Sequence, residues 1–291
     1  MTRALDGRAA LITGASQGLG LAIARAFVDA GASVVLCARD LAVLDRARVD
    51  LAAHADSGQR VIAERADVSS VDDVARIVGA ATTAFPHLDI LVNNAGVQGP
   101  MGDVDEVPWN DWVHAIAVNL FGSVACCRAV VPHMKGLGHG KIIQLSGGGA
   151  TAPTPHMSAY AASKAGIVRF VETLAQEVRP HGIDVNAIAP GALNTRMLDD
   201  VITAGPDRIG RDRYERALKQ KAEGGAPVER AAALAVFLAS AKSRGISGKL
   251  ISAVWDPWET LDEHADDLAR TDVYTLRRIT PEERNLRWGK S

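Results

Sequence analysis

Residues that could move a proton to or from a carbonyl oxygen surround a short glycine run in the middle of the chain. Tyr160 and Lys164 stand four apart in a predicted helix at 159–180, and Ser146 directly precedes the glycines at 147–149. Positions four apart share one face of a helix. An ammonium beside a phenol lowers the phenol's pKa from ~10, so Tyr160 could exchange a proton with a carbonyl or an alcohol. Taken alone, the pair is equally typical of an ordinary amphipathic helix.

The elements that must position these residues alternate along the chain. Short apolar runs, which predict buried strands, are separated by longer stretches with helical spacing. Such strands indicate a parallel sheet covered on both faces, and right-handed crossovers make it doubly wound. We therefore predict one α/β domain over 1–256, with a Rossmann-type sheet of seven parallel strands and helices on both faces. The predicted strands lie at 9–14, 33–39, 60–68, 88–96, 141–146, 183–191 and 249–255, and the main helices at 20–31, 41–55, 71–85, 110–136 and 159–180.

Polar residues and glycines gather just after the ends of these predicted strands. Ligands of doubly wound sheets bind beyond the carboxyl ends of the strands. We therefore expect one binding cleft, lined by residues from 14–20, Arg39, Asp67, 93–96, Ser146 and 190–195.

The turn after the first predicted strand has the composition of a phosphate-binding loop. Its sequence, TGASQGLG (13–20), carries glycines at 14, 18 and 20 and leads into the first helix. Glycine allows a tight turn and a close approach of backbone N–H groups to a pyrophosphate, which the helix N-terminus also favours. An ordinary glycine-rich loop is the alternative, and the position between strand and helix argues against it.

Five motifs in order resemble the short-chain dehydrogenase/reductase family, in its single-domain form, over about residues 7–254. They are T-G-x-x-x-G-x-G at 13–20, NNAG at 93–96, Asn119 in AVNLFG, the Tyr160/Lys164 pair, and PGALNT at 190–195. The resemblance implies hydride transfer between a nicotinamide cofactor and a carbonyl or secondary alcohol. It also implies that Tyr160 is the general acid/base, that Lys164 holds the nicotinamide ribose, and that Asn119 holds a water against the lysine.

The resemblance also implies a set of cofactor contacts. In the family, an acid placed like Asp67 contacts the adenine, Val68 packs against it, and Thr195 contacts the nicotinamide carboxamide. The full predicted set is Gly14, Ser16, Gln17, Gly18, Leu19, Gly20, Arg39, Asp67, Val68, Asn93, Ala95, Gly96, Tyr160, Lys164, Pro190, Gly191 and Thr195.

Some of these residues have a simpler explanation. Asp67 could be a turn former or a helix cap, Thr195 could cap the next helix, and Asn119 could be a polar residue at a helix kink. The family's serine usually stands thirteen before the tyrosine, where this chain has Gly147. Ser146 is one residue earlier and is our candidate to orient the substrate oxygen. Ser158 is the competitor, although a helix-capping role suits it better.

The end of the second strand bears on the choice of cofactor. A carboxylate there would accept the ribose hydroxyls of NAD, whereas this chain has Ala38 and then Arg39. A guanidinium suits the 2′-phosphate of NADP. Asp40 could partly neutralise Arg39, and Gln17 supplies no second cation. We therefore predict a preference for NADP(H), with NAD(H) possible.

Two segments fall outside the alternating pattern. Residues 192–226 are predicted to form a helical substrate lid, whose arginines (208, 211, 213 and 216) favour a polar or anionic substrate over a steroid or fatty chain. A solvated helix face is the simpler alternative. Residues 257–291 are a C-terminal extension. Because Trp255, Trp258, Tyr274 and Trp288 are costly to expose, we predict an ordered segment that packs on the domain or on a neighbouring subunit; a disordered tail is the alternative.

Composition limits the other functional classes. The chain has 291 residues, 47% of them hydrophobic and 23% charged, and a formal net charge of -2. This balance favours neither nucleic acid nor a membrane as partner, and no run of about 18 uninterrupted apolar residues predicts a span. The three cysteines lack metal-binding spacing, so no metal is predicted. We expect a cytoplasmic homodimer or homotetramer.

The predicted function is an NADP-dependent oxidoreductase acting on a small carbonyl or alcohol substrate. Two alternatives stay open. One is a catalytically idle NADP-binding sensor or scaffold, which the departure at Gly147 keeps in view. The other is an NAD-dependent epimerase or dehydratase, although that branch usually has a different glycine spacing.

Overall fold

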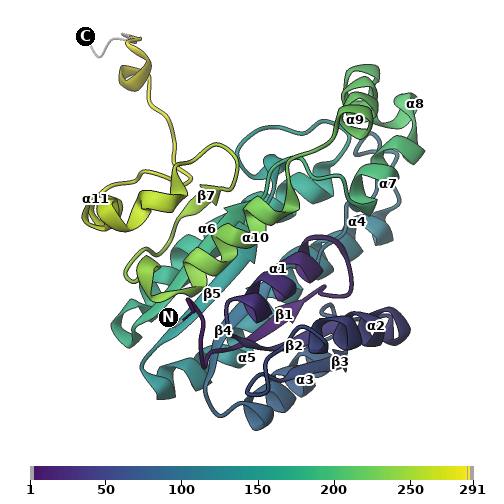
Figure 1. The fold of residues 1–291 in the computed structure, drawn as a ribbon. Coiled ribbons are helices and arrows are strands. Elements are labelled where there is room, and N and C mark those ends of the chain that lie inside the picture. The colour runs from purple at the N-terminus through teal and green to yellow at the C-terminus, as the bar shows by residue number, and fades with distance from the viewer. Residues whose placement is uncertain (1–2, 287, 289–291) are drawn as a thin grey trace.

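A seven-stranded, all-parallel sheet forms the centre of the molecule. The structure is a computed structural model that describes residues 3–286 and 288. The strand order is β3-β2-β1-β4-β5-β6-β7 (Figure 1), and this confirms the predicted doubly wound α/β class. The strands are β1 (Ala9–Thr13), β2 (Ser33–Ala38), β3 (Val61–Arg65), β4 (Leu88–Asn93), β5 (Gly140–Leu145), β6 (Ile183–Ala189) and β7 (Leu250–Ser252).

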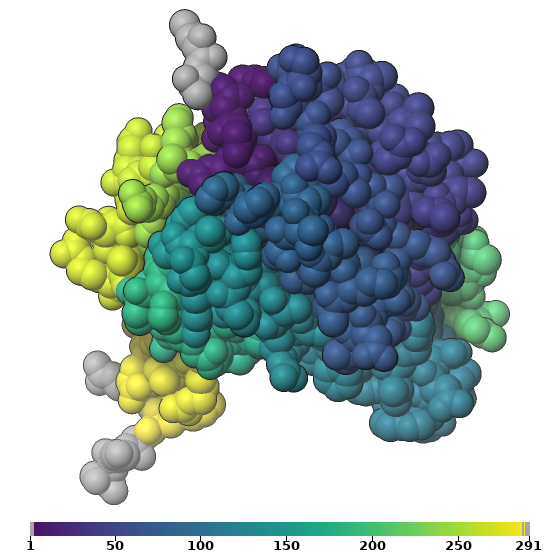
Figure 2. Space-filling view, turned by 90° about the horizontal axis from the view of Figure 1, so that it is seen from below, coloured from purple at the N-terminus to yellow at the C-terminus, as the bar shows by residue number. Residues whose placement is uncertain are grey.

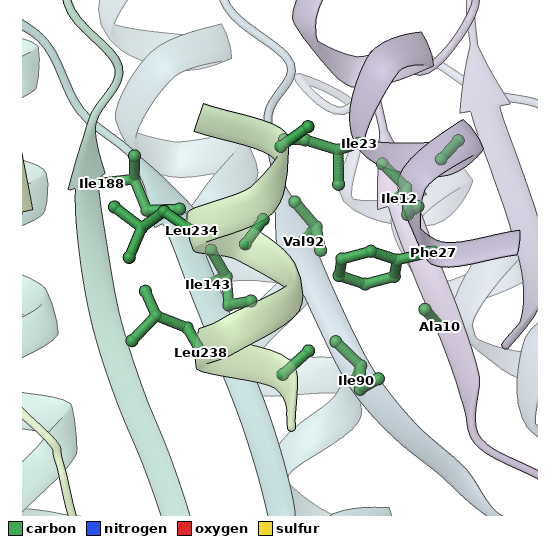
Figure 3. Close-up of a cluster of buried hydrophobic side chains, with 14 of the residues drawn as sticks. Ala10, Ile12, Ile23, Phe27, Ile90, Val92, Ile143, Ile188, Leu234 and Leu238 are labelled. Carbon is green, nitrogen blue, oxygen red and sulfur yellow. The ribbon is translucent and has the colours of Figure 1, made fainter. Parts of the chain in front are cut away.

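One face of the sheet is covered by α1 (Gly18–Asp29), α2 (Leu41–Ala52) and α10 (Val228–Ala239). Inward-facing residues of the central strands meet α1 and α10 in a single apolar cluster, in which Phe27, Ile12 and Leu234 are buried (Figure 3). Alternate strand residues face this side, and the rest face the opposite helices.

The other face is covered by α3 (Val71–Ala84), α5 (Gly122–Leu137) and α6 (Ser158–Val178), and α4 (Trp109–Ile116) packs against α6. The helix expected at 110–136 is interrupted by a π-helical turn, Ala117–Phe121, between α4 and α5. Cys37, Cys126 and Cys127 are all buried in this second cluster, and burial raises the pKa of each thiol to about 12. They therefore pack as small apolar side chains.

By length and composition alone, the helical stretch Trp109–Leu137 could cross a membrane. In this fold the stretch lies against the sheet, and Val130 and Met134 on its inner side are fully buried in the second cluster. Core packing therefore accounts for part of its apolar composition, whereas Trp109, Val113 and Phe121 of the same stretch are exposed.

The chain changes direction across the sheet between β1 and β4. It runs outward from β1 to β2 and β3, then returns to place β4 on the other side of β1. The loops that follow these two strands diverge there, which is where doubly wound sheets bind their ligands.

The predicted lid is helical but not continuous. It comprises α7 (Arg196–Ala204), α8 (Pro206–Ile209) and α9 (Arg211–Glu223). Gly205 and Gly210, both with φ of 78°, separate the three helices. Leu198, Val201 and Ala217 form a small apolar cluster of their own, so the lid packs as a separate unit.

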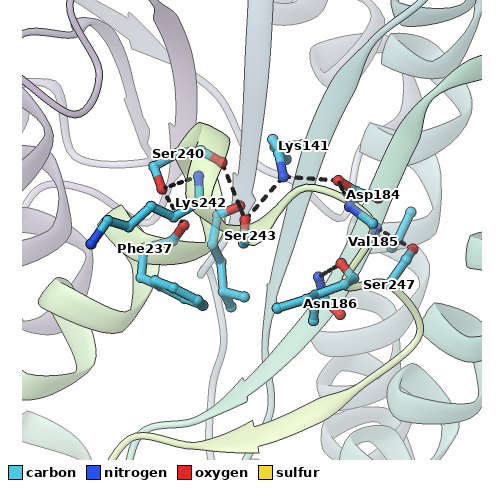
Figure 4. A network of polar contacts seen from close by, with 12 residues as sticks. Lys141, Asp184, Val185, Asn186, Phe237, Ser240, Lys242, Ser243 and Ser247 are labelled. Atoms are coloured by element: carbon cyan, nitrogen blue, oxygen red, sulfur yellow. Dashed lines mark hydrogen bonds and ion pairs between the residues drawn. The ribbon is translucent and has the colours of Figure 1, made fainter. Parts of the chain in front are cut away.

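A polar network joins the last two crossovers at the end of the sheet opposite the ligand edge. Lys141 Nζ donates to Asp184 Oδ2 (2.8 Å) and to Ser243 Oγ (2.9 Å), and Asn186 Nδ2 donates to the carbonyl of Ile246 (2.7 Å) (Figure 4). Burial lowers the pKa of Lys141, and the charge of Asp184 opposes that effect. These contacts fix the connection that leads into β7.

The C-terminal extension follows β7 and begins at that edge of the sheet (Figure 1), and it forms the yellow part of the surface in Figure 2. The strand expected at 249–255 ends at Ser252, because Asp256 Oδ2 accepts the Ser252 N–H (2.6 Å) and the chain turns. The Leu250 N–H then donates to the carbonyl of Tyr274 (2.8 Å), so the extension covers the outer side of β7. It contains a 3-10 segment, Trp258–His264, and α11 (Ala265–Arg270).

Buried charged and aromatic groups hold the extension in place. Lys249 Nζ donates to the carbonyls of Thr271 and Val273 (2.9 Å each), and Glu172 Oε1 accepts the Leu276 N–H (2.6 Å). Trp258 packs beside Phe237 in the first cluster. Trp255 and Trp288 are exposed, Tyr274 is half-buried, and residues 287 and 289–291 of the predicted extension lie outside the described residues.

Two neighbouring tryptophans test how the extension contributes to stability. Trp258 is 8% exposed, and Trp255 is 84% exposed. Trp258→Ala should lower the free energy of unfolding by about 3–5 kcal/mol, since a large buried side chain is removed. The matched control, Trp255→Ala, should stay within about 0.5 kcal/mol of the parent. Urea unfolding of both variants measures this, and equal losses would contradict the packing of the extension.

Candidate active site

A hydrogen-bonded clamp joins the loops that follow β1 and β4. Thr13 Oγ1 accepts the N–H groups of Asn94 (3.0 Å) and Ala95 (3.1 Å). In return, Asn94 Nδ2 donates to the carbonyls of Thr13 and Gly14 (3.0 Å each). The two loops are therefore held together at the point where the sheet reverses its order.

The same clamp requires glycine in the first loop. A Cβ on Gly14, which has a φ of 64°, would lie 2.8 Å from Cα of Ala95, and a Cβ on Gly20 would lie 2.3 Å from the Gly14 carbonyl oxygen. Any side chain at either position would push the loops or α1 apart. The glycine spacing thus brings the N-terminus of α1 against the strand ends.

A cavity of about 300 Å³ opens beside this loop. It is lined by the first loop, the ends of β2 and β3, the loop after β4, and the start of the lid. Among the residues predicted to bind a cofactor, this lining includes Gly14, Ser16, Gln17, Leu19, Gly20, Arg39, Asp67, Val68, Ala95, Gly96 and Thr195. The bare glycine backbone at a helix N-terminus, with a cation at the far end, fits the pyrophosphate and adenosine end of a dinucleotide.

Arg39 is exposed at the end of this cavity, and Asp40 does not pair with it. Instead, Asp40 Oδ1 accepts the N–H groups of Ala42 (3.0 Å) and Val43 (3.1 Å) and caps α2. The possible neutralisation of Arg39 by Asp40 is therefore not observed, because the capping role occupies the carboxylate.

Asp67 has the turn-forming geometry that the sequence left open. Its Oδ1 accepts both the N–H (2.9 Å) and the hydroxyl (2.7 Å) of Ser69. Burial works to raise the pKa of Asp67, but the Ser69 hydrogen bonds and the charge of Arg39 outweigh it and lower that pKa. The carboxylate thus keeps its charge while it lines the cavity.

A second cavity, of about 430 Å³, adjoins the first. The two share residues such as Asn94, Gly96 and Thr195. Ser146, Tyr160 and Lys164 all line this second cavity, as do Pro190 and Gly191. The structure therefore brings the predicted proton-transfer residues to one space, next to the space that fits a dinucleotide.

The hydroxyl of Tyr160 lies directly over Gly147. A Cβ built on Gly147 would be 2.4 Å from Tyr160 Oη. A side chain at position 147 would therefore require the tyrosine hydroxyl to move, and glycine lets the hydroxyl take this position.

Ser146 has a buried hydroxyl, and its Oγ makes no hydrogen bond within the described part of the chain. Because the residue lines the cavity with Tyr160, this hydroxyl is available to a bound molecule. The competing Ser158 is engaged elsewhere: its Oγ accepts the indole N–H of Trp112 (3.1 Å) rather than capping α6. The structure thus favours Ser146 and corrects the capping role expected of Ser158.

Lys164 is a buried lysine that faces the end of β5. Its Nζ donates to the carbonyl of Leu145 (3.0 Å), and burial lowers its pKa to about 8. The same Nζ lies 5.6 Å from the centroid of the Tyr160 ring. The amine is thus directed at a backbone carbonyl and not at the Tyr160 hydroxyl.

The predicted lowering of the Tyr160 pKa by Lys164 is wrong for this structure. Burial raises the pKa of Tyr160 above its ordinary value, and the cation that works against this rise is Arg213. Near neutral pH the hydroxyl is therefore a neutral phenol, which is the form that can donate a proton.

Asn119 lies in the π-helical turn and lines neither of the two cavities. Its Oδ1 accepts the N–H of Val97 (2.8 Å), and its Nδ2 donates to the Val97 carbonyl (2.9 Å) and to Ser163 Oγ (3.0 Å). A Cβ on Gly96 would be 3.2 Å from Asn119 Oδ1 and 3.8 Å from Lys164 Nζ. Asn119 is therefore a positioning residue between the loop after β4 and α6.

Two other predicted contacts line neither cavity. Asn93 is buried and turned away from both cavities, with Nδ2 3.4 Å from the Ser123 carbonyl. Successive strand residues point to opposite sides, so its neighbour Asn94 lines the cavities instead. Gly18 also lines neither cavity, and its φ of 59° serves the start of α1.

Thr195 is the residue before α7 and lines both cavities, but its side chain makes no capping hydrogen bond. The capping alternative is therefore not observed. Asn94, Met197 and Arg213 also line the cavities and were not in the predicted set. Strand alternation could have identified Asn94, whereas the other two depend on how the lid folds back.

The fold and the paired cavities define a dinucleotide-binding enzyme of the hydroxyl–carbonyl oxidoreductase type. The sequence model described as "short chain dehydrogenase" matches residues 8–205. The chain belongs to the short-chain dehydrogenase/reductase family, as the motif resemblance predicted, and this is a family of oxidoreductases that act on hydroxyl and carbonyl groups.

Individual relatives have varied printed names. A 3beta-hydroxysteroid dehydrogenase 1 from Eggerthella lenta is 38% identical over 245 residues, which cover 84% of this chain and 91% of the relative. A solved structure of a gluconate 5-dehydrogenase from Burkholderia cenocepacia, in complex with NADP and tartrate, is 29% identical and superimposes with a TM-score of 0.75. The match covers 85% of this chain and 94% of the gluconate dehydrogenase chain. A xylitol dehydrogenase solved with NAD+ is 25% identical with a TM-score of 0.75 and covers 85% and 98%.

The burial of Lys164 has a consequence for stability. Its pKa falls from 10.5 to about 8 on folding, so below pH 8 the charged amine costs the fold about 3 kcal/mol. The unfolded chain binds more protons between about pH 8 and 10.5, so this cost disappears as the pH rises through that window. Lys164→Met should therefore unfold at higher urea than the parent at pH 7 and should lose this advantage by about pH 10.5.

The loss of the hydrogen bond to Leu145 offsets about 1 kcal/mol of that gain. Lys219→Met, on an exposed part of α9, is the matched control and should be neutral at both pH values. A stability difference between Lys164→Met and the parent that did not change with pH would contradict the lowered pKa.

Proposed function

We propose that this chain is an NADP-dependent oxidoreductase that interconverts a carbonyl and a secondary alcohol, with Tyr160 as general acid/base. The observation that carries the proposal is the placement of the Tyr160 hydroxyl over Gly147, in one cavity with Ser146 and Lys164 and beside the cavity that fits a dinucleotide.

A bound nicotinamide supplies or accepts the hydride, and the chain's own residues handle the proton and the orientation. In the reducing direction the carbonyl carbon gains the hydride and the oxygen gains the Tyr160 proton; in the oxidising direction both leave the alcohol. Ser146, with its unpaired hydroxyl, is suited to donate a hydrogen bond to the same oxygen. Lys164 lines the same cavity and is suited to supply positive charge near the ring of Tyr160.

The raised pKa of Tyr160 has opposite effects on the two directions. Reduction needs the neutral phenol, which prevails up to alkaline pH because burial raises the pKa. Oxidation needs the phenolate and should therefore become faster as the pH rises. The electrostatics of the cavity thus support reduction near neutral pH.

The role of Tyr160 is tested by Tyr160→Phe. Removal of the hydroxyl should lower kcat about 10²–10⁴-fold, the usual contribution of general acid catalysis. NADPH binding, followed by the fluorescence of the reduced nicotinamide, should change little. Tyr214→Phe is the matched control, since Tyr214 packs in the lid cluster and lines neither cavity.

Near-normal turnover of carbonyls or alcohols by Tyr160→Phe would exclude the general acid/base role. If the parent binds NADP(H) but turns over none of a panel of carbonyls and alcohols, the idle sensor or scaffold becomes the better interpretation. Cofactor-dependent conversion without net change in nicotinamide absorbance would point to the epimerase or dehydratase alternative.

Arg39 supports the choice of NADP over NAD. Its guanidinium is exposed at the cavity end, and Asp40 is engaged as a helix cap. A guanidinium can pair with a 2′-phosphate by charge-assisted hydrogen bonds. The neighbouring solved structures hold NAD+ in one case and NADP in another, so the preference rests on this residue.

The cofactor preference is tested by Arg39→Asp. Loss of a charge-assisted hydrogen bond, which contributes about 1.5–3 kcal/mol, should lower kcat/KM for NADPH about 10- to 100-fold. The value for NADH should fall less or rise. Arg46→Asp, which makes the same charge change on α2 outside both cavities, is the control. An unchanged NADPH/NADH ratio in Arg39→Asp would remove Arg39 from the proposal. Assembly as a homodimer or homotetramer and a cytoplasmic location stay predictions of the sequence.

A further inference from the structure

The charge of the second cavity is entirely of one sign. Its lining includes three cationic side chains, Lys164, Arg213 and Arg216, and no aspartate or glutamate. A cavity of about 430 Å³ with this lining is an unfavourable place for a cation and a favourable one for an anion.

Arg213 carries most of this effect. It is half-buried on α9, and burial is the main cause that lowers its pKa, with Arg216 adding to it. Other cations of the same helix do have carboxylate partners, such as Lys221 with Asp199 (2.7 Å) and Lys219 with Glu223 (3.9 Å). Within the described residues, Arg213 has no ion pair. A partly buried cation of this kind is stabilised when an anion joins it.

An anion bound to Arg213 would share a cavity with the hydroxyl of Tyr160. Arg213 and Tyr160 line the same cavity, so the guanidinium and the phenol face the same space. Arg213 does not line the cavity that fits the dinucleotide, where Arg39 and the glycine loop lie. The phosphates of the cofactor are thus unsuited as its partner, and a substrate group is suited.

The remaining walls limit the size of that substrate. Leu198, Val201 and Ala217 of the lid line the same cavity as Arg213. These apolar residues close over a short carbon chain, and the guanidinium fork offers paired hydrogen bonds to a planar or tetrahedral oxyanion.

We propose that Arg213 binds the oxyanion, a carboxylate or a phosphate, of a small hydroxy or oxo substrate whose reacting oxygen faces Tyr160. This proposal rests on the proposed oxidoreductase function and specifies its substrate class. Arg216, exposed at the edge of the same cavity, adds positive potential without a fixed contact.

Calorimetric titration separates this proposal from the catalytic one. The probes are malonate, inorganic phosphate and the neutral malonamide, each added to the protein saturated with NADP+ and, separately, without it. At least one oxyanion should bind tenfold or more tightly than malonamide. Tighter malonate identifies a carboxylate substrate, and tighter phosphate identifies a phosphate ester.

The variant arm assigns the site to Arg213. Arg213→Met should weaken the favoured oxyanion tenfold or more, and Arg213→Lys should weaken it less. Arg211→Met, on the same helix but outside the cavity, is the matched control and should bind like the parent. Circular dichroism and thermal unfolding check that each variant folds; if Arg213→Met does not, the parent's oxyanion and malonamide affinities still decide.

A kinetic arm uses acetoacetate and its methyl ester. Arg213→Met should raise KM for acetoacetate at least tenfold and leave KM for methyl acetoacetate within threefold. Malonamide binding as tightly as both oxyanions, or an Arg213→Met variant that binds them like the parent, would overturn the proposal. Oxyanion binding in a protein that turns over no carbonyl or alcohol would instead contradict the oxidoreductase function alone.

Discussion

The site depends on a lysine that is buried without a carboxylate. Lys164 is 4% exposed, and its amine donates to one backbone carbonyl, that of Leu145 at the end of β5. A buried ammonium is costly, so the surrounding chain must hold α6 against β5 firmly enough to bear that cost. Asn119 contributes to this, because it bonds the backbone of Val97 in the loop after β4 and the Ser163 hydroxyl on α6 at the same time.

A second constraint on the site comes from the end of the sheet at which the strand order reverses. At the reversal between β1 and β4, Thr13 and Asn94 bond each other's loops, and glycine at positions 14 and 20 lets those loops touch. Asn94 of this clamp lines both the cavity that fits the pyrophosphate and adenosine end of a dinucleotide and the cavity with Tyr160. The two cavities adjoin because one loop, residues 94–98, forms a wall of both.

The sequence predicted the sheet, the cleft and most of the lining, because strand and helix patterns are local and the motifs lie at strand ends. Its set of cofactor contacts named Asn93 and not Asn94, although strand alternation favours Asn94, which lines both cavities. The position of the Tyr160 hydroxyl over Gly147 could not be predicted, since it depends on how closely α6 approaches the loop after β5. Arg213 was one of four lid arginines in the sequence, and only the breaks at Gly205 and Gly210 determine which of them faces the tyrosine.

Two buried lysines outside the site, Lys141 and Lys249, have carboxylates nearby, unlike the cations of the site. Lys141 meets Asp184 at 2.8 Å, and Lys249 donates to two carbonyls with Asp272 and Glu172 nearby to favour its charge. Lys141 connects β5 to the start of β6, Lys249 holds the C-terminal extension, and each has carboxylates that work against the effect of burial on its pKa. In the cavity with Tyr160, no carboxylate of the described chain lines the walls. The structural cations thus have acidic groups nearby, whereas Lys164, Arg213 and Arg216 share a cavity without one among the described residues. Under the proposed function, a bound anion would supply the missing negative charge beside the reacting hydroxyl.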